Sequence, residues 1–403
     1  MNTSHELILL AGSLGLVSIV VGAMSARLQA PLLLVFLLLG MLAGEDGPGG
    51  IAFNDFHASY LIGSIALAVI LFEGGLKTHR ATIRLAIAPS LALATIGITL
   101  TAGIVATAAV WLFSLSWPQA LLIGAVLAPT DAAAVNHMLR SAAIAAPERV
   151  TAALELESGL NDPMSVFLTA LLVEGLTSSS SPTAGHALLL LLEEMGGGAL
   201  AGIIGGNLLL WLLRRLPVQI SLYPVLALSA VLFVFGAAQT LGASGFLAVY
   251  LVGIVVGTKG FEKLPALTYA AETFAWLAQV ILFLMLGLLV APHELIPFIG
   301  PILAIAMVLL FLGRPLGCFA CLLPFGYSAR EAAFVSWAGL RGAAPIYLAI
   351  IPVLAGLNEG PSFFGAVFGV VIASLALQGW TFAPAARLLG FARRSGAQTD
   401  PLK

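Results

Sequence analysis

The stretch VTAALELESGLNDPMSVFLTALLVE, residues 150–174, decides the fold class of this chain. It has the length of a membrane-spanning helix, which is about 17–25 residues, yet it carries Glu155, Glu157 and Asp162 in its interior. An isolated charge at the bilayer midplane costs at least about 2.5–3.5 kcal/mol. The stretch therefore predicts a membrane helix whose charged residues face a water-filled cavity or one another.

The composition of the whole chain agrees with this reading. Of 403 residues, 60% are hydrophobic and 9% are charged, whereas a soluble domain is about 25% charged. The mean hydropathy of +1.07 leaves too little polar surface for a soluble globule. These values exclude a soluble enzyme, a disordered protein and a nucleic-acid binder, and they indicate an all-α polytopic membrane protein.

Charges, Pro/Gly clusters and polar loops divide the chain into about thirteen predicted membrane spans, with boundaries accurate to several residues. They lie near 7–25, 30–43, 59–76, 86–113, 119–139, 150–174, 187–213, 220–241, 243–258, 266–290, 295–313, 329–351 and 362–389. Ser178–Pro182 is predicted to be a flexible linker, and residues 390–403 a short tail without a soluble domain.

The basic residues predict the orientation. Sixteen of the 17 fall in the odd-numbered loops or the tail, with Arg27 in the first loop and Arg314 and Arg330 flanking the eleventh loop. The even-numbered loops carry acids instead, namely Glu45, Asp46, Asp55 and Glu359. By the positive-inside rule, the N-terminus is expected outside and the C-terminus in the cytoplasm.

Four charges are predicted to converge near the midplane. At about 1.5 Å of rise per residue, Asp131 lies roughly 14 Å, Glu157 roughly 12 Å, Asp162 roughly 20 Å and Arg341 roughly 16 Å from the basic end of its span. Arg341 is the one basic residue in the middle of a span, and Glu73 lies at a shallower depth. Charges at this depth are candidates for function.

Pro129 is predicted to break the fifth span, because proline cannot donate the usual helical hydrogen bond and clashes with the preceding turn. Asp131 would then begin a second half-helix, where the helix dipole stabilises a carboxylate. The carbonyls freed by Pro129, together with Thr130, are candidate cation ligands, as in interrupted helices of transporters. The alternative is a simple kink in which Asp131 is only a structural N-cap.

The sixth span presents two neighbouring polar faces, because residues four apart share a face. Glu157 and Asn161 share one face, and Ser158 and Asp162 share the other. The simplest assignment pairs Glu157 with Arg341, steadied by Asn161, and leaves Asp162 free for a proton or a cation. The alternative makes Asp162 the partner of Arg341.

Pro163 is a second predicted helix break, since it leaves the carbonyl four residues earlier without its usual donor. The roles of four more polar residues stay open at this stage, and they are His137, Glu155, Glu194 and Glu272. Cys318 and Cys321 form a CxxC pair without a second Cys/His pair nearby, which argues against a zinc site and for a packing role.

Several segments resemble the monovalent cation/proton antiporter superfamily, in order and over nearly the whole chain. They are LFEGGL (Leu71–Leu76), APTDAAAV (Ala128–Val135), ELESGLNDP (Glu155–Pro163) and GLRGAAP (Gly339–Pro345). GMLAGEDGPGGI (Gly40–Ile51) and LAVYLVG (Leu247–Gly253) further resemble the branch of cell-volume-regulation potassium/proton antiporters.

The resemblance implies one transmembrane antiporter domain, residues 1–403, built from two inverted six-helix repeats with broken crossing helices. Repeat one covers about 7–174, a connector helix about 187–213 and repeat two about 220–389. A mobile core domain, a dimerisation domain, a homodimer and a place in the cell inner membrane are also implied. Many members of the branch carry a long cytoplasmic regulatory region after the last helix, and none is expected in this chain, which ends at Lys403.

The resemblance also implies a site. Asp162 matches the ion-binding aspartate of the superfamily, with Thr130, Asp131 and Ser158 as neighbouring ligands. Glu157 and Arg341 match its buried ion pair, and Glu73 its cytoplasmic-side acid. An Asn before the Asp, as in Asn161-Asp162, goes with electroneutral exchange.

The expected function is one-for-one exchange of a monovalent cation, K⁺ or Na⁺, for H⁺ by competition at Asp162. No enzyme activity, cofactor or nucleic-acid partner is expected. The alternatives are a proton-coupled symporter, a channel for small ions and an intramembrane aspartyl protease using Asp131 and Asp162, although a GxGD motif is lacking. The choice of K⁺ depends on the branch resemblance alone.

Overall fold

The computed structural model describes residues 9, 12–22, 31–178, 183–217, 219–357 and 360–391. Within these ranges the chain is built from helices joined by turns and loops, and its β-structure is limited to isolated bridge residues such as Gly44 and Ile51. The predicted all-α fold is therefore confirmed. Several residues named above lie outside the described ranges, and they are Arg27, 179–182 of the predicted linker, Glu359 and the tail from 392 to 403.

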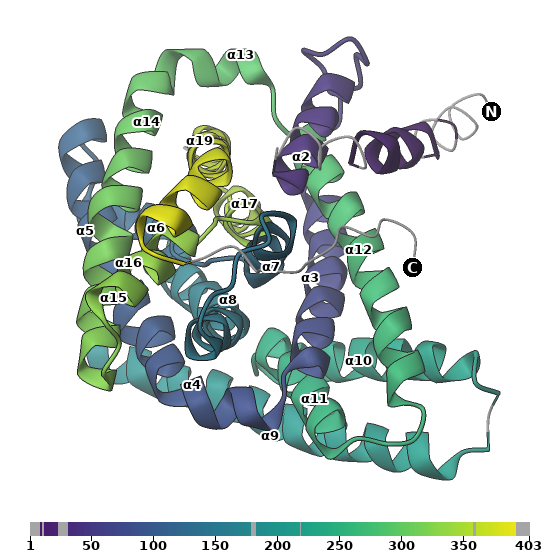
Figure 1. The fold of residues 1–403 in the computed structure, drawn as a ribbon. Coiled ribbons are helices and arrows are strands. Elements are labelled where there is room, and N and C mark those ends of the chain that lie inside the picture. The colour runs from purple at the N-terminus through teal and green to yellow at the C-terminus, as the bar shows by residue number, and fades with distance from the viewer. Residues whose placement is uncertain are drawn as a thin grey trace.

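A series of helices follows the short apolar helix Gly12–Gly22, and most of them are labelled in Figure 1. They are α2 (Leu32–Ala43), α3 (Phe56–Lys77), α4 (Arg80–Ala92), α5 (Ile98–Phe113), α6 (Trp117–Leu127), α7 (Ala132–Ser141), α8 (Glu148–Thr177), α9 (Ala184–Arg215), α10 (Leu222–Thr240), α11 (Gly245–Lys259), α12 (Leu264–Leu288), α13 (Pro292–Leu295), α14 (Ile299–Val308), α15 (Arg314–Leu322), α16 (Ala329–Ala338), α17 (Ala343–Leu348), α18 (Ile350–Leu354) and α19 (Gly360–Leu388). Single π-helical turns join α4 to α5 and α14 to α15.

The helix ends follow ordinary capping chemistry. Asp55 accepts a hydrogen bond from the Ala58 amide at the start of α3, and Ser328 and Glu331 form a reciprocal capping box at the start of α16. Such caps satisfy amides that have no partner inside the helix. Polar residues between the apolar runs thus set where the helices begin.

By length and composition, seven described helices could cross a membrane, or nine if each of two bent helix pairs counts as one span. Gly12–Gly22, α2 and α11 are apolar but shorter, and α8 is long but carries several charges. The chain is thus a multi-pass membrane protein, and the number thirteen stays a prediction.

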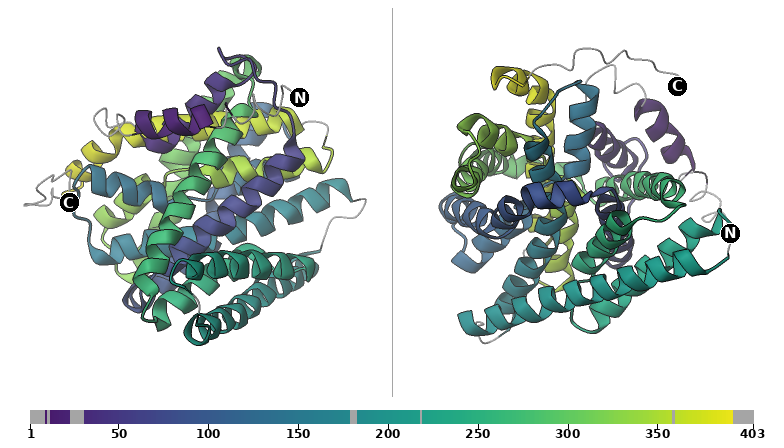
Figure 2. Two further views of the ribbon diagram at one scale, coloured as in Figure 1. Left: turned by 90° about the vertical axis from the view of Figure 1, so that its right-hand side faces the viewer. Right: turned by 60° about the horizontal axis from the view of Figure 1, so that its bottom comes forward.

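The helices form two groups. One, which we call the α3 bundle, comprises α2, α3 and α9–α12, and the other, the α8 bundle, comprises α4–α8 and α14–α19. Figure 1 shows the α8 bundle on the left and the α3 bundle along the right and the bottom, and Figure 2 shows α9 as a long helix at the edge of the molecule. Gly75 and Gly253 let α3 and α11 cross with their backbones in contact.

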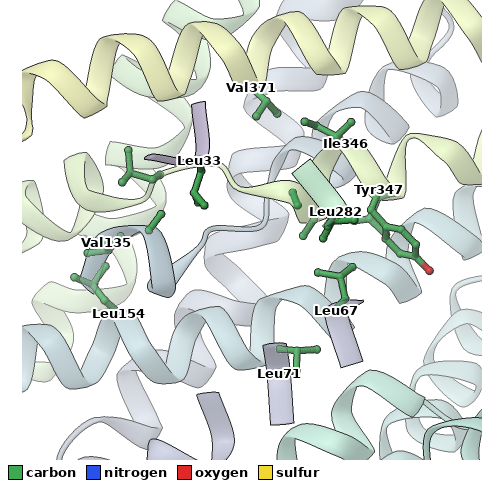
Figure 3. Packing of buried hydrophobic residues seen from close by; sticks show 14 of the residues in the cluster. Leu33, Leu67, Leu71, Val135, Leu154, Leu282, Ile346, Tyr347 and Val371 are labelled. Atoms are coloured by element: carbon green, nitrogen blue, oxygen red, sulfur yellow. The ribbon is translucent and has the colours of Figure 1, made fainter. Parts of the chain in front are cut away.

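A continuous hydrophobic core joins the two bundles. Figure 3 shows Leu67 of α3 close to Leu282 of α12 and Tyr347 of α17, and Leu154 of α8 beside Val135 of α7. All of these side chains are buried. Because the cluster draws on both bundles, the polar site described below is enclosed by apolar packing.

Pro129 interrupts its span as predicted, since α6 ends at Leu127 and α7 begins at Ala132. The prediction for Pro163 is wrong, because α8 runs unbroken from Glu148 to Thr177 with Pro163 inside it. One missing hydrogen bond does not end this helix, since packing against neighbouring helices supplies most of a helix's stability in a folded protein. Pro163 is buried in that packing.

The predicted end of the eleventh span at residue 313 is also wrong. A single helical stretch continues from Pro292 to Phe325, so Arg314 lies inside it and is only 4% exposed. Arg314 therefore does not belong to the basic loops that supported the predicted orientation, and the remaining loop residues carry that argument.

Candidate functional site

Two interrupted helices meet at their breaks. The first break, Ala128–Asp131, bends α6 against α7 by 42°, and the second break, Gly339–Gly342, bends α16 against α17 and α18 by 53°. The Asp131 amide donates a hydrogen bond to the Leu340 carbonyl at 2.9 Å. Each break therefore supplies a partner for backbone groups that the other leaves without a helical bond.

Arg341 lies in the second break and donates hydrogen bonds to the first. Its Nη1 donates to the carbonyl oxygens of Ala128 at 2.7 Å and of Pro129 at 3.1 Å. The carbonyls that were expected to be open cation ligands thus already accept hydrogen bonds from a buried guanidinium. Arg341 is 0% exposed, so its charge is held within the protein core.

Asp131 caps α7 and also faces the site. Its Oδ1 accepts a hydrogen bond from the Ala134 amide at 3.1 Å, which is the geometry of an N-cap. Both expected features of Asp131 are therefore present, since it begins the second half-helix and lines the central cavity.

Two residues of α8 fasten the first break to that helix. Ser158 Oγ donates to the Thr130 carbonyl at 2.9 Å and accepts from the Ala132 amide at 3.1 Å. Asn161 Nδ2 donates to Thr130 Oγ1 at 2.8 Å. The expectation that Asn161 steadies a Glu157–Arg341 pair is wrong, because its amide donates to Thr130 within the first break.

Asp162 lies beside these contacts. Among the described residues, its buried Oδ1 has no hydrogen-bond partner, and no ion pair joins it to Arg341 or Arg314. The alternative in which Asp162 is the partner of Arg341 is therefore not what the structure contains. Asp162 lines the same cavity as Thr130, Asp131 and Ser158.

The partner of Glu157 is Arg314 rather than the predicted Arg341. Arg314 Nη2 donates to Glu157 Oε2 at 2.8 Å, and Nη1 makes a second bond to Oε1. This two-pronged arrangement matches a guanidinium to a carboxylate, and Glu157 is 0% exposed. Arg341 bonds backbone carbonyls because it sits within the second break, directly against the first.

The site opens into a cavity of about 580 Å³. The cavity extends from Asp131 and Asp162 to Lys77, His79 and Arg140, which are residues at the ends of α3, α4 and α7. These are also residues of the loops that the sequence predicts to be cytoplasmic. The described residues hold no group of three or more His, Cys, Asp or Glu suited to a bound metal.

Acidic side chains are distributed along the cavity mouth. Lys77 Nζ lies 2.5 Å from Glu73 and 3.2 Å from Glu272, so it joins α3 to α12. Glu155 accepts a hydrogen bond from Asn136 at 3.2 Å, which joins α8 to α7. Glu73 is thus brought to the cavity, as expected, although it is paired with a lysine.

The other residues whose roles the sequence left open lie in different parts of the structure. His137 lines the cavity and packs edge-on to Trp276, with ring centroids 6.1 Å apart. Glu194 on α9 lies away from the cavity wall. Cys318 and Cys321 are free and buried in α15.

Comparison with known proteins agrees with this arrangement. The family model for the transmembrane sodium/hydrogen exchangers matches residues 15–388. The chain belongs to the sodium/hydrogen exchanger family.

Relatives of this exchanger cover all or nearly all of its length. The K(+)/H(+) antiporter NhaP of Alkalimonas amylolytica is 44% identical over 405 residues, which is 100% of this chain and 70% of the relative. The K(+)/H(+) antiporter NhaP2 of Shewanella baltica is 42% identical over 389 residues, which is 96% of this chain and 67% of the relative.

A solved structure shares the fold of the exchanger. The sodium proton antiporter MjNhaP1 of Methanocaldococcus jannaschii, solved at pH 8, superposes with a TM-score of 0.80. The match has 24% sequence identity and covers 96% of this chain and 100% of that chain. This likeness supports the architecture of two bundles with interrupted helices.

Sequence reasoning missed one residue of the exchanger's site, Arg314. A signal was present, because the sequence after Arg314 stays apolar for another turn or more and the next basic residue is Arg330. A charge with apolar sequence on both sides is buried more often than a charge at a span end. The identity of its partner needs the fold, since Glu157 lies far away in the sequence.

Proposed function

We propose that this exchanger moves a monovalent cation, K⁺ or Na⁺, against H⁺ across the membrane, and that Asp162 carries both ions in turn. The observation that supports this is the buried carboxylate of Asp162, which lines the cavity and whose Oδ1 has no hydrogen-bond partner in the described part of the chain. A carboxylate taken out of water is stabilised by a proton or by a bound cation. The transported ions are the substrates, and exchange needs no cofactor.

Competition at one carboxylate accounts for one-for-one exchange. Asp162 holds a proton or a cation but not both, so each crossing carries the same charge and the exchange is electroneutral. Thr130, Asp131 and Ser158 lie next to Asp162 and supply oxygen atoms for a cation, which is the ligand type that such ions prefer. Glu73 acts at the cytoplasmic mouth, as the first acid that an arriving cation meets.

Two buried interactions hold the site in shape. The Glu157–Arg314 pair and the bonds from Arg341 to the first break fix α8, α15 and the two breaks relative to one another. Because neither arginine is paired with Asp162, the aspartate remains available for exchange. The proposed roles of Asp162 and Glu157 are therefore kept, but the arginine that pairs with Glu157 is Arg314 and not the predicted Arg341.

The division into moving parts is also a proposal. Repeat one, the connector and repeat two are assigned to about 7–174, 187–213 and 220–389. We assign the mobile core to the α8 bundle and the dimerisation domain to the α3 bundle, because the cavity and the breaks lie where the two bundles meet. A homodimer in the cell inner membrane is proposed from the same resemblance, and sedimentation in detergent checks the dimer.

The orientation places the cavity mouth in the cytoplasm, the N-terminus outside and the C-terminus inside. Lys77, His79 and Arg140 at the mouth support it, because positive charge accumulates on the cytoplasmic side. K⁺ is favoured over Na⁺ because the relatives NhaP and NhaP2 are K(+)/H(+) antiporters.

Cation-dependent proton flux in proteoliposomes tests the proposal. We expect added K⁺ or Na⁺ to dissipate an imposed pH gradient, and Asp162→Asn to abolish the response because an amide binds neither ion as a carboxylate does. Glu194→Gln is the matched control, since it makes the same change at a residue outside the cavity wall. Full exchange by folded Asp162→Asn protein would overturn the assignment of Asp162 as the residue that carries the ions. The same assay repeated with Li⁺, Na⁺, K⁺ and Rb⁺ measures cation selectivity.

A further inference from the structure

One side chain of the α3 bundle lies directly against the ion-binding turn of α8. It is Tyr250 of α11, which is 2% exposed and lines the cavity. Within the ranges that the structure describes, no hydrogen bond of ordinary geometry reaches its hydroxyl, and Thr78 is a nearby polar group that interacts with it more weakly. A buried phenol usually finds a partner, so the position of this ring calls for a reason other than a hydrogen bond.

The ring rests on Gly159, and the fit leaves no room for a side chain. A Cβ on Gly159 would lie 2.7 Å from Tyr250 Cε1 and closer still to Cζ and Cε2. Gly159 follows Ser158 and precedes Asp162 by three residues, roughly one helical turn. The tip of the ring is therefore in contact with the bare backbone of the turn that carries the proposed ion site.

The two partners belong to different bundles. The Tyr250 backbone is fixed to the α3 bundle, because its carbonyl oxygen packs against Gly75 of α3 so closely that a Cβ there would overlap it. Gly159 belongs to α8, which packs mainly on α4 and α6. Any displacement of one bundle along the other must carry the backbone of Gly159 past this ring.

We propose that Tyr250 and Gly159 form a sliding contact, in which the flat ring of the α3 bundle guides the ion-binding turn of α8 as the site changes sides. Tyr250 is then a positioning residue for transport that acts through α8, and a side chain at position 159 obstructs the movement. This inference rests on the exchange proposed above. The contact is made by the ring, so the hydroxyl is dispensable.

The test distinguishes an effect on movement from an effect on cation binding. Exchange rates are measured in proteoliposomes, and thermal stabilisation by cations is measured in detergent. We expect Gly159→Ala to lower the maximal exchange rate at least tenfold while the cation concentration for half-maximal exchange changes less than threefold. Cation-induced thermal stabilisation should remain, whereas Asp162→Asn should lose both signals. Tyr250→Phe should exchange like the unaltered protein.

Removing the ring should relieve the obstruction. We expect the double variant Gly159→Ala with Tyr250→Ala to recover at least threefold over Gly159→Ala alone. Gly74→Ala is the matched control, because Gly74 is also helical and lines the cavity but a Cβ there meets no atom within 4 Å. It should leave the exchange rate unchanged.

Several results would overturn the sliding contact. They are a normal rate in Gly159→Ala, no recovery in the double variant, or a loss of cation-induced stabilisation equal to that of Asp162→Asn. If Gly159→Ala does not fold, the variant Tyr250→Leu provides the test. A maximal exchange rate that changes at least threefold, with an unchanged cation concentration for half-maximal exchange, supports the contact, and an unchanged maximal rate overturns it. Absence of exchange in the unaltered protein would instead overturn the proposed function.

Discussion

At the scale of single residues, the site contains two buried guanidinium groups and one carboxylate, Glu157, which is paired with only one of them. Glu157 takes the bidentate bonds of Arg314, while Arg341 is directed at the carbonyls of Ala128 and Pro129. A buried charge that loses its partner keeps its desolvation cost without compensation. The two arginines should therefore respond differently when Glu157 is changed.

Arg314→Met is predicted to destabilise the protein by about 3–5 kcal/mol, because it leaves Glu157 buried and unpaired. Arg330→Met is the matched control, since Arg330 is exposed on α16. Thermal unfolding in detergent measures both. A double-mutant cycle with Glu157→Gln should give a larger coupling energy for Arg314 than for Arg341, and equal coupling would contradict the pairing.

Some of the site follows from sequence and some does not. Asp131 as the first residue of a half-helix was predictable, since Pro129 two residues earlier acts through local backbone rules. The partner of Glu157 was not, because Arg314 reaches it only through the packing of α15 against the rest of the α8 bundle. A helix break can be predicted from neighbouring residues, whereas the pairing of charges that are distant in the sequence depends on how the helices pack together.

At the scale of elements, the first break is held mainly from α8. Ser158 bonds both the Thr130 carbonyl and the Ala132 amide, so one hydroxyl satisfies backbone groups on each side of Asp131. Pro129 and Pro163 show why such partners matter. The chain opens at Pro129, where α8 and the second break offer replacement bonds, and stays helical at Pro163, where the sequence alone had predicted a second opening.

Ser158→Ala is predicted to cost about 1–3 kcal/mol of stability, because a buried amide and carbonyl lose their partner. It should also raise the cation concentration for half-maximal exchange, since the first break positions Asp131. Ser158→Thr keeps the hydroxyl and serves as the control. Thermal unfolding and proteoliposome flux measure the two effects, and an unchanged half-saturation in Ser158→Ala would contradict the role given to the break.

A second contact between elements predicts a pH dependence outside the membrane. Asp46, in the loop after α2, accepts a hydrogen bond from the His293 amide at 2.8 Å and lies 2.6 Å from the ring Nδ1 at the start of α13. The backbone bond and then the ring lower the pKa of Asp46. Its stabilising effect is therefore present above the unfolded pKa of about 3.9 and is lost as the pH falls through the lower, folded value.

Asp46 in turn raises the pKa of His293 through their hydrogen bond, so the effect is complete below the ordinary histidine pKa of about 6.5 and is lost as the pH rises through the higher, folded value. Asp46→Asn is thus predicted to lower the thermal midpoint most between about pH 4 and 6.5 and least above the folded pKa of His293. Unfolding scans across this range measure the difference, with Asp55→Asn as a second loop variant. A difference that is constant with pH would contradict the charge pairing.

At the scale of the whole molecule, the cavity is lined at one end by Lys77, His79 and Arg140, which belong to the predicted cytoplasmic loops. Asn136→Cys, in the cavity wall, is predicted to react with a membrane-impermeant thiol reagent from the cytoplasmic side. Cys318 and Cys321 are buried and give a low background. Leu241→Cys, in the exposed turn between α10 and α11, should react from the outside. The reverse pattern would invert the orientation.

The Glu157–Arg314 pair also has a consequence for how the protein is made. The two residues are 157 positions apart, so a nascent chain delivers α8 to the membrane long before α15 is synthesised. Until then the carboxylate has no cation and resists burial in lipid. Ribosome-bound intermediates that stop short of residue 314 should keep α8 loosely inserted, and emergence of α15 should lock both helices in place.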